Sequence, residues 1–320
     1  SRLTATQVRI LALAQNNPGT GFSVQTLFSS LNMKFFRLFL ISICLFAVIS
    51  IFYLFGPTSF SDEKVTFVVP LEAKHEETVS KLKSENLIRN DLIFNILAGM
   101  IKFPGTIEPG GYLLSHRMTL IDITDTLLNK PYQKWAVLVP GLRKEQAAEK
   151  LAKKFSWGEA KMKEFLSNTQ EGYLFPDTYL LNVDYSGKQF ADRLLSNFNE
   201  HFDAKMQKDL LDQNVRNDTA IKIASLIERE SGDDGDKALI AGVIWNRLKI
   251  GMKLQIDATI QYAIGTSADW WPLVQHKDLA IDSDFNTYLI KGLPPSPIAN
   301  PSLASIKAAI YPAETDCFFY

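Results

Sequence analysis

An uncharged stretch near the N-terminus constrains this chain more than any other feature. Residues 38–55 form a run of 18 amino acids without a charge. Together with Phe35 and Phe36, the run is long enough to cross a bilayer as a helix. A cleaved signal peptide is the competing interpretation, with 59–61 as a weak cleavage site, but the run exceeds the usual apolar length of such a peptide. We therefore predict an uncleaved transmembrane helix over 35–55.

The charges on either side of this run predict its orientation. Lys34 and Arg37 lie on its N-terminal side, whereas Asp62 and Glu63 follow it. Because positive residues favour the cytoplasmic side, we expect the N-terminus in the cytoplasm and everything after a linker at 56–64 outside it. No later segment of the sequence is long and apolar enough to span a membrane.

The segment 1–34 in front of the run has two interpretations. Residues 1–32 contain no methionine, and Met33 would be a reasonable native start. The segment is then either an artefact of the reading frame or a short cytoplasmic helix followed by a turn at 18–21. The sequence leaves this choice open.

Composition and charge argue against several functions. The 320 residues are 46% hydrophobic and 22% charged with a formal net charge of −1, which leaves room for two domains besides the membrane segment. Without a basic run, there is no electrostatic case for nucleic acid as a partner. Cys44 and Cys317 form neither a disulfide framework nor a metal site. The four histidines also lack metal-ligand spacing: His75, His116, His201 and His276.

Short helices and strands predict an α+β fold in two parts. The first part is a small module over 65–131, which ends at the break Asn129-Lys-Pro131. Its expected strands are 64–70 and 111–114, and its expected helices are 76–84, 91–101 and 120–128. The second part, 132–320, is expected to be a larger mixed α/β domain with strands at 134–140 and 317–320 and helices at 144–155, 189–211, 236–249, 258–264 and 301–310. Because the last strand begins just as the chain ends, we expect a truncated C-terminus.

Two glutamates at the end of an apolar helix are the strongest candidates for chemistry. The helix is expected between Asp218 as its N-cap and Gly232 just past its end. At roughly 100° per residue, Glu230 stands above the apolar stripe, whereas Glu228 stands at its edge. A carboxyl group held against apolar side chains keeps its proton more readily, so Glu230 is the better general acid. The alternative is that both glutamates are solvated and pair with neighbouring basic residues.

Aromatic and polar side chains supply candidate sugar contacts. Tyr173 lies in the aromatic segment 171–179, where a saccharide could stack on a ring or the rings could be ordinary core. Asp257 is expected to N-cap the helix at 258–264, whereas Gln255 beside it has no such structural role.

A proline-stiffened loop over 286–301 is expected to hold a shaped surface at low entropic cost. Asn300 is expected to cap the following helix, with Pro301 at its first position. The pair Trp270-Trp271 could be a sugar platform or a packed loop corner, and nothing local decides between them.

Four motifs follow one another in the second part: Glu171-Gly-Tyr-Leu-Phe-Pro-Asp-Thr-Tyr179, Ala224-Ser-Leu-Ile-Glu-Arg-Glu230, Asn246-Arg-Leu-Lys-Ile-Gly-Met-Lys-Leu-Gln-Ile-Asp257, and Asn286-Thr-Tyr288 with Gly292-Leu-Pro-Pro295. In this order they resemble the YceG/MltG family of endolytic murein transglycosylases. The resemblance covers residue 38 to the end and implies a single membrane anchor, a LysM-like module matching 65–131 and a catalytic domain over 132–320. A glycine-rich turn, a strand and a helix that follow in the family are missing here, and 1–32 has no family counterpart.

The family resemblance also implies a reaction and a setting. The reaction is cleavage of the β-1,4 bond between N-acetylmuramic acid and N-acetylglucosamine in nascent strands, leaving a 1,6-anhydro end and terminating elongation. No cofactor or metal is implied. The setting is the bacterial inner membrane, with an extracytoplasmic catalytic domain, peptidoglycan strands as substrate and peptidoglycan synthases as partners. Glu230, the second glutamate of the pair, would be catalytic, and Glu228 would either orient it or pair with Arg247. The substrate would contact Gln255, Asp257, Asn246, Arg247, Asn286, Tyr288 and Tyr173.

Three other functions stay open. A glycan hydrolase would ordinarily need a second carboxylate roughly 5–10 Å from the first. A non-catalytic wall-binding anchor would use only the LysM-like module. A lyase acting on aminodeoxychorismate, a label the same family has carried, would need pyridoxal phosphate on a lysine, and the membrane run and the lack of a recognisable cofactor lysine speak against it.

Overall fold

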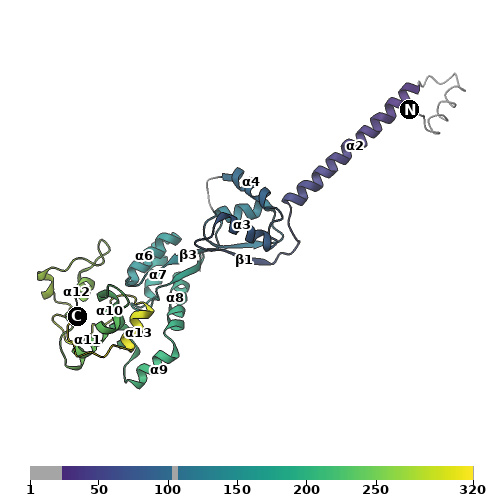
Figure 1. Ribbon diagram of the computed structural model, residues 1–320. Helices are drawn as coiled ribbons and strands as arrows, with labels where there is room; N and C mark the ends of the chain where they lie inside the picture. The colour runs from purple at the N-terminus through teal and green to yellow at the C-terminus, as the bar shows by residue number, and fades with distance from the viewer. Residues whose placement is uncertain (1–23, 103–106, 320) are drawn as a thin grey trace. The chain divides into compact units, whose positions relative to one another are not determined.

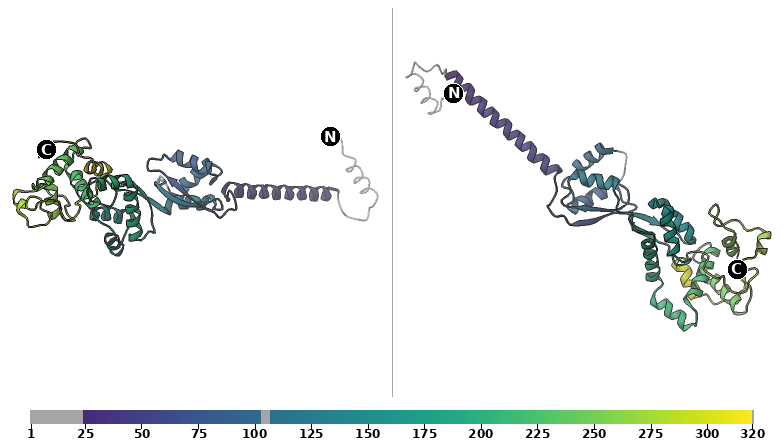
Figure 2. Two further views of the ribbon diagram at one scale, coloured as in Figure 1. Left: turned by 90° about the horizontal axis from the view of Figure 1, so that it is seen from below. Right: turned by 180° about the vertical axis from the view of Figure 1, so that it is seen from behind.

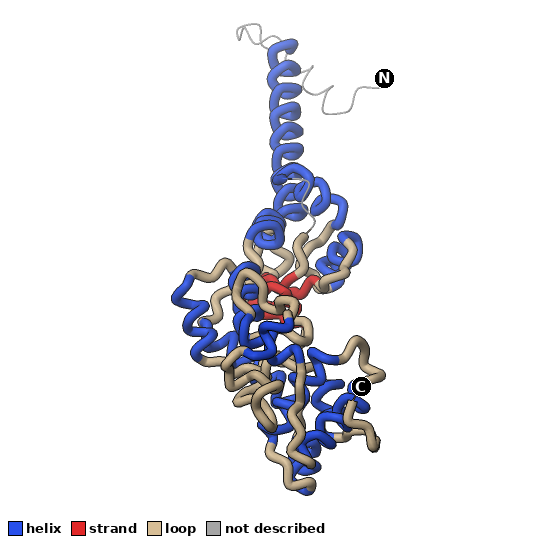
Figure 3. Tube along the Cα trace, turned by 90° about the vertical axis from the view of Figure 1, so that its left-hand side faces the viewer, coloured by secondary structure: helices blue, strands red, loops and turns tan. Residues whose placement is uncertain are grey.

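The computed structural model describes residues 24–102 and 107–319, so residues 1–23 of the predicted segment 1–34 lie outside the described residues. Helices and loops make up most of the described chain, and the strands form one small sheet, which gives an α+β fold (Figure 3). The chain divides into two compact units. The first comprises the chain up to Thr66, Lys74–Ile107 and Leu113–Asn129, and the second comprises Phe67–Ala73, Glu108–Tyr112 and Lys130–Tyr320.

The first unit carries the long apolar helix. Helix α2 spans Val24–Phe55 (Figure 1). Within the described residues, its segment Phe35–Phe55 is the one helix that is long and apolar enough to cross a membrane, with 21 residues. The predicted helix over 35–55 is thus confirmed as a helix. Its side chains are mostly exposed, so the helix is not part of a protein core, and a helix that is apolar on all sides is otherwise typical of a membrane span.

Three more helices of the first unit confirm the predicted ones: α3 (His75–Ser84), α4 (Asp91–Lys102) and α5 (Leu120–Asn129). Helix α3 has acidic residues in its first turn and lysines in its last turn, which complements the helix dipole. Leu82 and Ile123 are fully buried, so these short helices are held by a small apolar core.

A four-stranded sheet runs in the order β1-β2-β3-β4. Its strands are β1 (Lys64–Val69), β2 (Gly110–Ser115), β3 (Gln133–Val137) and β4 (Thr178–Asn182). The predictions for β1, β2 and β3 are confirmed, but β4, which begins at the end of the aromatic segment 171–179, was not predicted. Tyr179 and Leu181 alternate inward along β4 into the core beside α6, and β4 pairs antiparallel with β3, which explains the strand.

The second unit is mainly helical (Figures 1 and 2). The predicted helix over 189–211 is wrong as a single element, because the chain breaks at Phe202 and Asp203 N-caps a new helix by accepting from the Met206 backbone N–H at 2.8 Å. The helices are α6 (Lys144–Phe155), α7 (Glu159–Ser167), α8 (Gly187–His201), α9 (Ala204–Asp212), α10 (Asn217–Glu230), α11 (Lys237–Lys249), α12 (Asp257–Ile264), the short 3₁₀ helix η1 (His276–Ala280) and α13 (Leu303–Ile310).

The strand predicted at 317–320 does not form in the described residues up to Phe319. Side chains of α11 take the carbonyl groups that a strand would need. Asn246 Nδ2 donates to the carbonyl oxygens of Thr315 and Cys317 at 2.6 and 3.1 Å. Arg247 Nε donates to the carbonyl oxygen of Phe318 at 2.6 Å, so side chains of α11 hold this segment as irregular chain.

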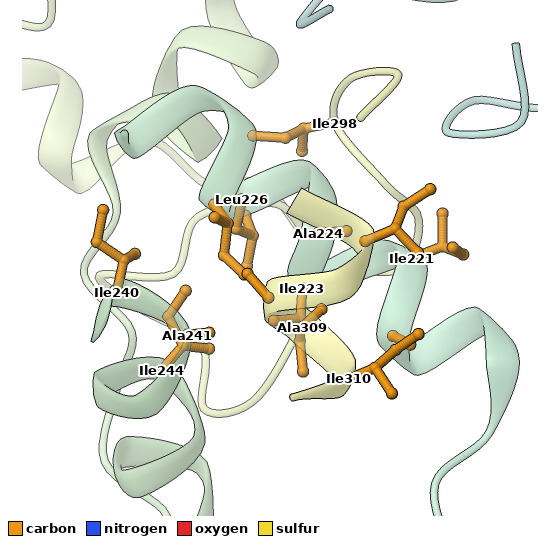
Figure 4. Packing of buried hydrophobic residues seen from close by; sticks show 14 of the residues in the cluster. Ile221, Ile223, Ala224, Leu226, Ile240, Ala241, Ile244, Ile298, Ala309 and Ile310 are labelled. Atoms are coloured by element: carbon orange, nitrogen blue, oxygen red, sulfur yellow. The ribbon is translucent and has the colours of Figure 1, made fainter. Parts of the chain in front are cut away.

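Helix α10 is the centre of the core of the second unit. It packs more extensively against α13 than against any other element. Figure 4 shows Ala309 and Ile310 of α13 beside Ile223 of α10, and Leu226 of α10 near the side chains of α11. The apolar side chains of α10 from Ile223 to Ile227 are almost completely buried, which confirms the stripe predicted from the sequence.

The substitution Leu226→Ala should lower the free energy of unfolding by about 2–5 kcal/mol, because it leaves a cavity in a fully buried site. Leu211→Ala, at a side chain that is 75% exposed, should change it by no more than about 0.5 kcal/mol. Urea denaturation followed by circular dichroism measures both. Equal losses in the two variants would contradict the assignment of α10 to the core.

Candidate active site

Helix α10 ends with three charged residues, Glu228, Arg229 and Glu230, and the two glutamates are the catalytic candidates predicted from the sequence. The helix begins at Asn217, so Asp218 is not its N-cap as predicted. Asp218 lies in the first turn instead and pairs with Arg216 at 2.9 Å and Lys222 at 3.6 Å. The described residues contain no group of three or more His, Cys, Asp or Glu side chains that could hold a metal ion.

Glu228 is bound to the N-terminus of α13. Its Oε2 accepts from the Ser302 backbone N–H at 2.8 Å, from the Ser302 hydroxyl at 2.6 Å and from the Ser305 hydroxyl at 2.6 Å. Lys237 Nζ of α11 lies 3.4 Å from the same oxygen, and the two side chains are only 10% and 7% exposed. A carboxylate at a helix N-terminus gains from the helix dipole and satisfies N–H groups without intrahelical partners. Glu228 therefore fastens α10, α11 and α13 together.

This arrangement corrects the position that the helical wheel assigned to Glu228. The wheel placed it at the exposed edge of the stripe, but α13 and Lys237 cover that edge. Ser225, one turn earlier, is fully buried and its hydroxyl accepts from the Ile298 backbone N–H at 3.1 Å. Packing by distant segments thus decides which glutamate is enclosed.

Arg229 packs on an aromatic ring. Its guanidinium carbon lies 3.8 Å from the centre of the Trp271 ring, and the guanidinium of Arg143 lies 4.4 Å from the same ring. Burial lowers the pKa of Arg229, and the two neighbouring glutamates oppose that effect. Gly141, with φ of 77°, lets the backbone approach, since a Cβ there would stand 3.2 Å from Nη1 of Arg229. The arginine is therefore held on the side of α10 that carries the tryptophan loop.

The two tryptophans are packed loop residues. Trp271 Nε1 donates to Gln146 Oε1 at 3.0 Å, and Trp270 Nε1 donates to Glu149 Oε2 at 3.1 Å. Both acceptors lie on α6, so the rings fasten the loop after α12 to that helix. These bonds support the packed loop corner, whereas a role of the rings as a sugar platform stays untested.

Glu230 shares an electrostatic environment with Tyr288 and Asp257. The Tyr288 hydroxyl donates to Asp257 Oδ1 at 2.5 Å. Burial, the bond to Asp257 and the charges of Asp257 and Glu230 raise the pKa of Tyr288 to about 12, while Arg247 opposes them. Glu230 itself is half-buried, whereas Asp257 is exposed. Asp257 is the first residue of α12 and not its N-cap, which is Ile256, so the predicted capping role is wrong and its carboxylate holds the tyrosine instead.

Gln255 lies beside these residues in an unusual backbone conformation. Its φ is 51°, the left-handed region that a residue with a Cβ rarely adopts. The Gln255 backbone N–H donates to the Thr287 carbonyl at 3.1 Å, and the next N–H, of Ile256, donates to the Thr287 hydroxyl at 3.0 Å. These bonds place 255–257 next to the loop that carries Tyr288 and leave the Gln255 side chain exposed. Such strained residues cluster at functional sites.

Three other predicted contact residues act inside the protein. Asn286 is fully buried, donates to the carbonyl oxygens of Leu279 and Ile281 at 3.1 and 2.7 Å, and accepts from the Tyr288 backbone N–H at 2.9 Å. Asn246 and Arg247 hold the 315–318 segment, and Arg247 also donates to the Leu254 carbonyl. These three side chains shape the loops around Tyr288 and Gln255.

Tyr173 lies at the other end of α10. Its ring packs 4.9 Å from that of Phe198, and burial together with the charge of Asp218 raises the pKa of its hydroxyl. Asp218 and Glu230 are separated by about 18 Å along the helix at 1.5 Å per residue. The structure therefore does not bring Tyr173 together with Glu230.

Glu171 and Asn300 form a polar centre that the sequence prediction missed. Asn300 does not cap α13, whose N-cap is Ser302; its Nδ2 donates to the Leu142 carbonyl at 2.9 Å and to Glu171 Oε1 at 3.1 Å. Its Oδ1 accepts from the backbone N–H groups of Gly172 and Leu174 at 3.0 and 2.8 Å. Burial raises the pKa of Glu171 to about 8, although the hydrogen bond from the Lys144 backbone N–H at 3.0 Å lowers it. The first motif contained Glu171, but only the fold shows that it is buried.

The sequence of this chain matches a known protein family and several of its members. The YceG-like family model matches residues 67–320, so the chain belongs to the YceG-like family. Over 151 residues it is 39% identical to an endolytic murein transglycosylase of Bacillus subtilis (strain 168), a match that covers 47% of this chain and 41% of that protein. It is 33% identical over 152 residues to an endolytic murein transglycosylase of Streptococcus pneumoniae serotype 2 (strain D39), covering 47% of this chain and 27% of that protein. The matched region thus spans less than half the length of either relative.

A solved structure supports the fold. The crystal structure of a YceG-like protein from Listeria monocytogenes is 28% identical in sequence and superposes with a TM-score of 0.56. The superposition covers 81% of this chain and 93% of the other.

Removing the carboxylate of Glu228 should destabilise the second unit strongly. Glu228→Ala should lower the free energy of unfolding by about 3–5 kcal/mol, because it leaves Lys237 with a buried charge and α13 without its cap partner. The matched control is Asp234→Ala, which removes another partner of Lys237, 2.8 Å away but 77% exposed, and should change stability by less than about 1 kcal/mol. Chemical denaturation measures both. A larger loss in the control would contradict the anchoring role.

The raised pKa of Glu171 predicts a pH dependence of stability. Between the usual carboxyl pKa of 4.5 and about 8, the unfolded chain loses this proton while the folded chain keeps it, so stability should fall as pH rises. The slope should be about 1 kcal/mol per pH unit from roughly pH 5 to 8. Glu171→Gln keeps the shape and should remove this part of the slope in unfolding curves recorded across the range. The same slope in both proteins would overturn the assignment.

Proposed function

We propose that this chain is a membrane-anchored endolytic peptidoglycan transglycosylase that cuts nascent glycan strands and so terminates their elongation. Membership of the YceG-like family and the names of the two relatives support the reaction class. Glu230 is the proposed catalytic acid and base, and the substrate strand is proposed to lie along Gln255, Asp257 and Tyr288.

The contacts of Glu228 with α13 and Lys237 support the choice of Glu230 as the catalytic residue. Of the two glutamates that end α10, Glu228 is enclosed by α13 and Lys237 and holds the fold together. Glu230 is half-buried and its charge acts on Tyr288, which lies on the loop of the fourth motif. A residue two positions further along a helix points in a different direction, so the two carboxyl groups do not act as a pair. We therefore revise the role of Glu228 from orienting Glu230 directly to positioning the helix end that carries it.

The proposed reaction uses one carboxyl group twice. Protonated Glu230 donates its proton to the glycosidic oxygen as the bond from that oxygen to C1 of N-acetylmuramic acid breaks. The carboxylate then takes the proton of the C6 hydroxyl as that oxygen bonds to C1 of the same sugar. The products are a 1,6-anhydro end and a free N-acetylglucosamine hydroxyl, and Glu230 is protonated again. No water is consumed.

A glycan hydrolase is the second candidate, and one observation favours it. Asp257 is an exposed carboxylate in the same electrostatic environment as Glu230, through Tyr288. A hydrolase needs such a second carboxylate to activate water or to form a glycosyl intermediate. In the structure Asp257 accepts a hydrogen bond from the Tyr288 hydroxyl. In our proposal Asp257 therefore holds Tyr288 in place and does not take part in the proton transfers.

The proposal also includes the setting of the enzyme. Helix α2 would anchor it in the inner membrane with the N-terminus in the cytoplasm, as the basic residues before the apolar run favour. The module over 65–131 would act as a LysM-like wall-binding element, and peptidoglycan synthases would be partners that supply nascent strands. The length of the apolar helix supports the anchor.

Glu230→Gln tests the catalytic assignment. The variant should lose cleavage of purified glycan strands by a factor of about 10² to 10⁴ or more, because glutamine cannot transfer a proton. Binding to sacculi and thermal stability should stay unchanged. Glu200→Gln, at a side chain that is 62% exposed, is the matched control and should cleave normally. Unchanged cleavage by Glu230→Gln would remove the assignment.

A further inference from the structure

The first unit contains a basic hollow where α2 ends. The hollow has a volume of about 540 Å³ and includes Tyr53 of the last helical turn. Its polar lining comes from two hydroxyls, an amide and three basic side chains: Thr58, Ser59, Asn86, Lys83, Arg89 and His116. We propose that it binds the phosphate group of an anionic membrane lipid, one whose head group has no compensating positive charge. The proposal rests on the membrane anchoring proposed above.

The hollow is built by hydrogen bonds to the segment after α2. Arg89 Nη1 donates to the carbonyl oxygens of Tyr53 and Gly56 at 2.8 and 3.0 Å, and Nη2 donates to that of Pro57 at 2.5 Å. The guanidinium also lies 5.1 Å from the centre of the Tyr53 ring. The arginine thus satisfies carbonyl groups that a helix C-terminus leaves open and fixes a positive charge at that end.

His116 holds the opposite wall. Its backbone carbonyl accepts from the Ser59 N–H at 3.0 Å and from the Thr58 hydroxyl at 3.3 Å. Its ring Nε2 donates to the Glu85 carbonyl at 3.1 Å. These contacts keep the Ser59 hydroxyl next to the basic side chains, where it can donate to an anion, whereas the Thr58 hydroxyl proton is taken by the His116 carbonyl.

Lys83 supplies a cation that can turn to a ligand. Its Nζ lies 3.4 Å from Asp91 Oδ1, in a pair whose side chains are 51% and 54% exposed. Such exposed pairs contribute little to stability. Lys83 can therefore exchange Asp91 for a phosphate at small cost.

The expected position of the hollow relative to the bilayer matches that of lipid phosphates. The segment Phe35–Phe55 has 21 residues, about 32 Å of helix, which matches the roughly 30 Å of a hydrocarbon core. Tyr53 then lies at the membrane interface, where tyrosines are enriched and lipid phosphates are found. The anion can come from an ordinary anionic phospholipid or from a polyprenyl pyrophosphate, the kind of carrier that would tether a growing glycan strand.

Lipid retention by the full chain tests this site. The protein in neutral detergent micelles is offered phosphatidylglycerol, phosphatidylcholine or a polyprenyl pyrophosphate, and bound lipid is counted by native mass spectrometry. The wild type should retain the two anionic lipids, and Lys83→Glu should weaken that retention at least fivefold. Lys81→Glu is the matched control on the same helix, since Lys81 does not line the hollow and pairs with Glu85, and it should retain lipid like the wild type.

The outcomes separate the lipid sources and the two proposals. Tighter retention of the pyrophosphate assigns the site to the strand carrier, and equal retention of both anionic lipids assigns it to bulk lipid. Equal retention of phosphatidylcholine, or an undiminished count in Lys83→Glu, overturns the proposal. Both lysine variants should cleave soluble glycan strands at the wild-type rate, so a failure of the wild type to cleave would contradict only the proposed function.

Discussion

The hydrogen bonds between Glu228 and the N-terminus of α13 hold the candidate site in place. Three donors from Ser302 and Ser305 and the ammonium group of Lys237 converge on one carboxylate oxygen, and they come from two helices distant in sequence. A buried carboxylate with this many donors is stable only when the helices stay together. The end of α10, which carries Glu230 two residues later, is therefore fixed.

The buried polar centre of Glu171 and Asn300 holds two further turns of the second unit together. Asn300 joins the turn before α6 to the turn that contains Gly172, and Glu171 bonds to both Asn300 and the start of α6. Two left-handed glycines in these turns leave room for neighbouring side chains: a Cβ on Gly141 would crowd Arg229, and one on Gly172 would crowd Pro297. The buried Asn286 then fixes the loop that presents Tyr288. Pre-organised loops of this kind reduce the reorganisation that a transition state requires.

Local patterns in the sequence predicted most of the helices and three of the four strands, because amphipathic periodicity and turn residues are local signals. They failed where distant segments decide the outcome. The helical wheel could not show that α13 covers Glu228, and the capping rules assigned Asp257 and Asn300 to helix ends although Tyr288 and Glu171 are their partners. Cys317 and its neighbours have β-propensity, but Asn246 and Arg247 take their carbonyl groups. The choice of Glu230 over Glu228 as the catalytic residue stays a prediction.

In the proposed reaction Glu230 alone moves both protons, and water does not enter. Cleavage of purified glycan strands in water enriched in ¹⁸O, followed by mass spectrometry of the new ends, tests it most directly. The account predicts anhydro ends that carry no ¹⁸O and are lighter than a reducing end by one water. Reducing ends that carry one ¹⁸O would contradict it and would assign Asp257 to a hydrolytic mechanism.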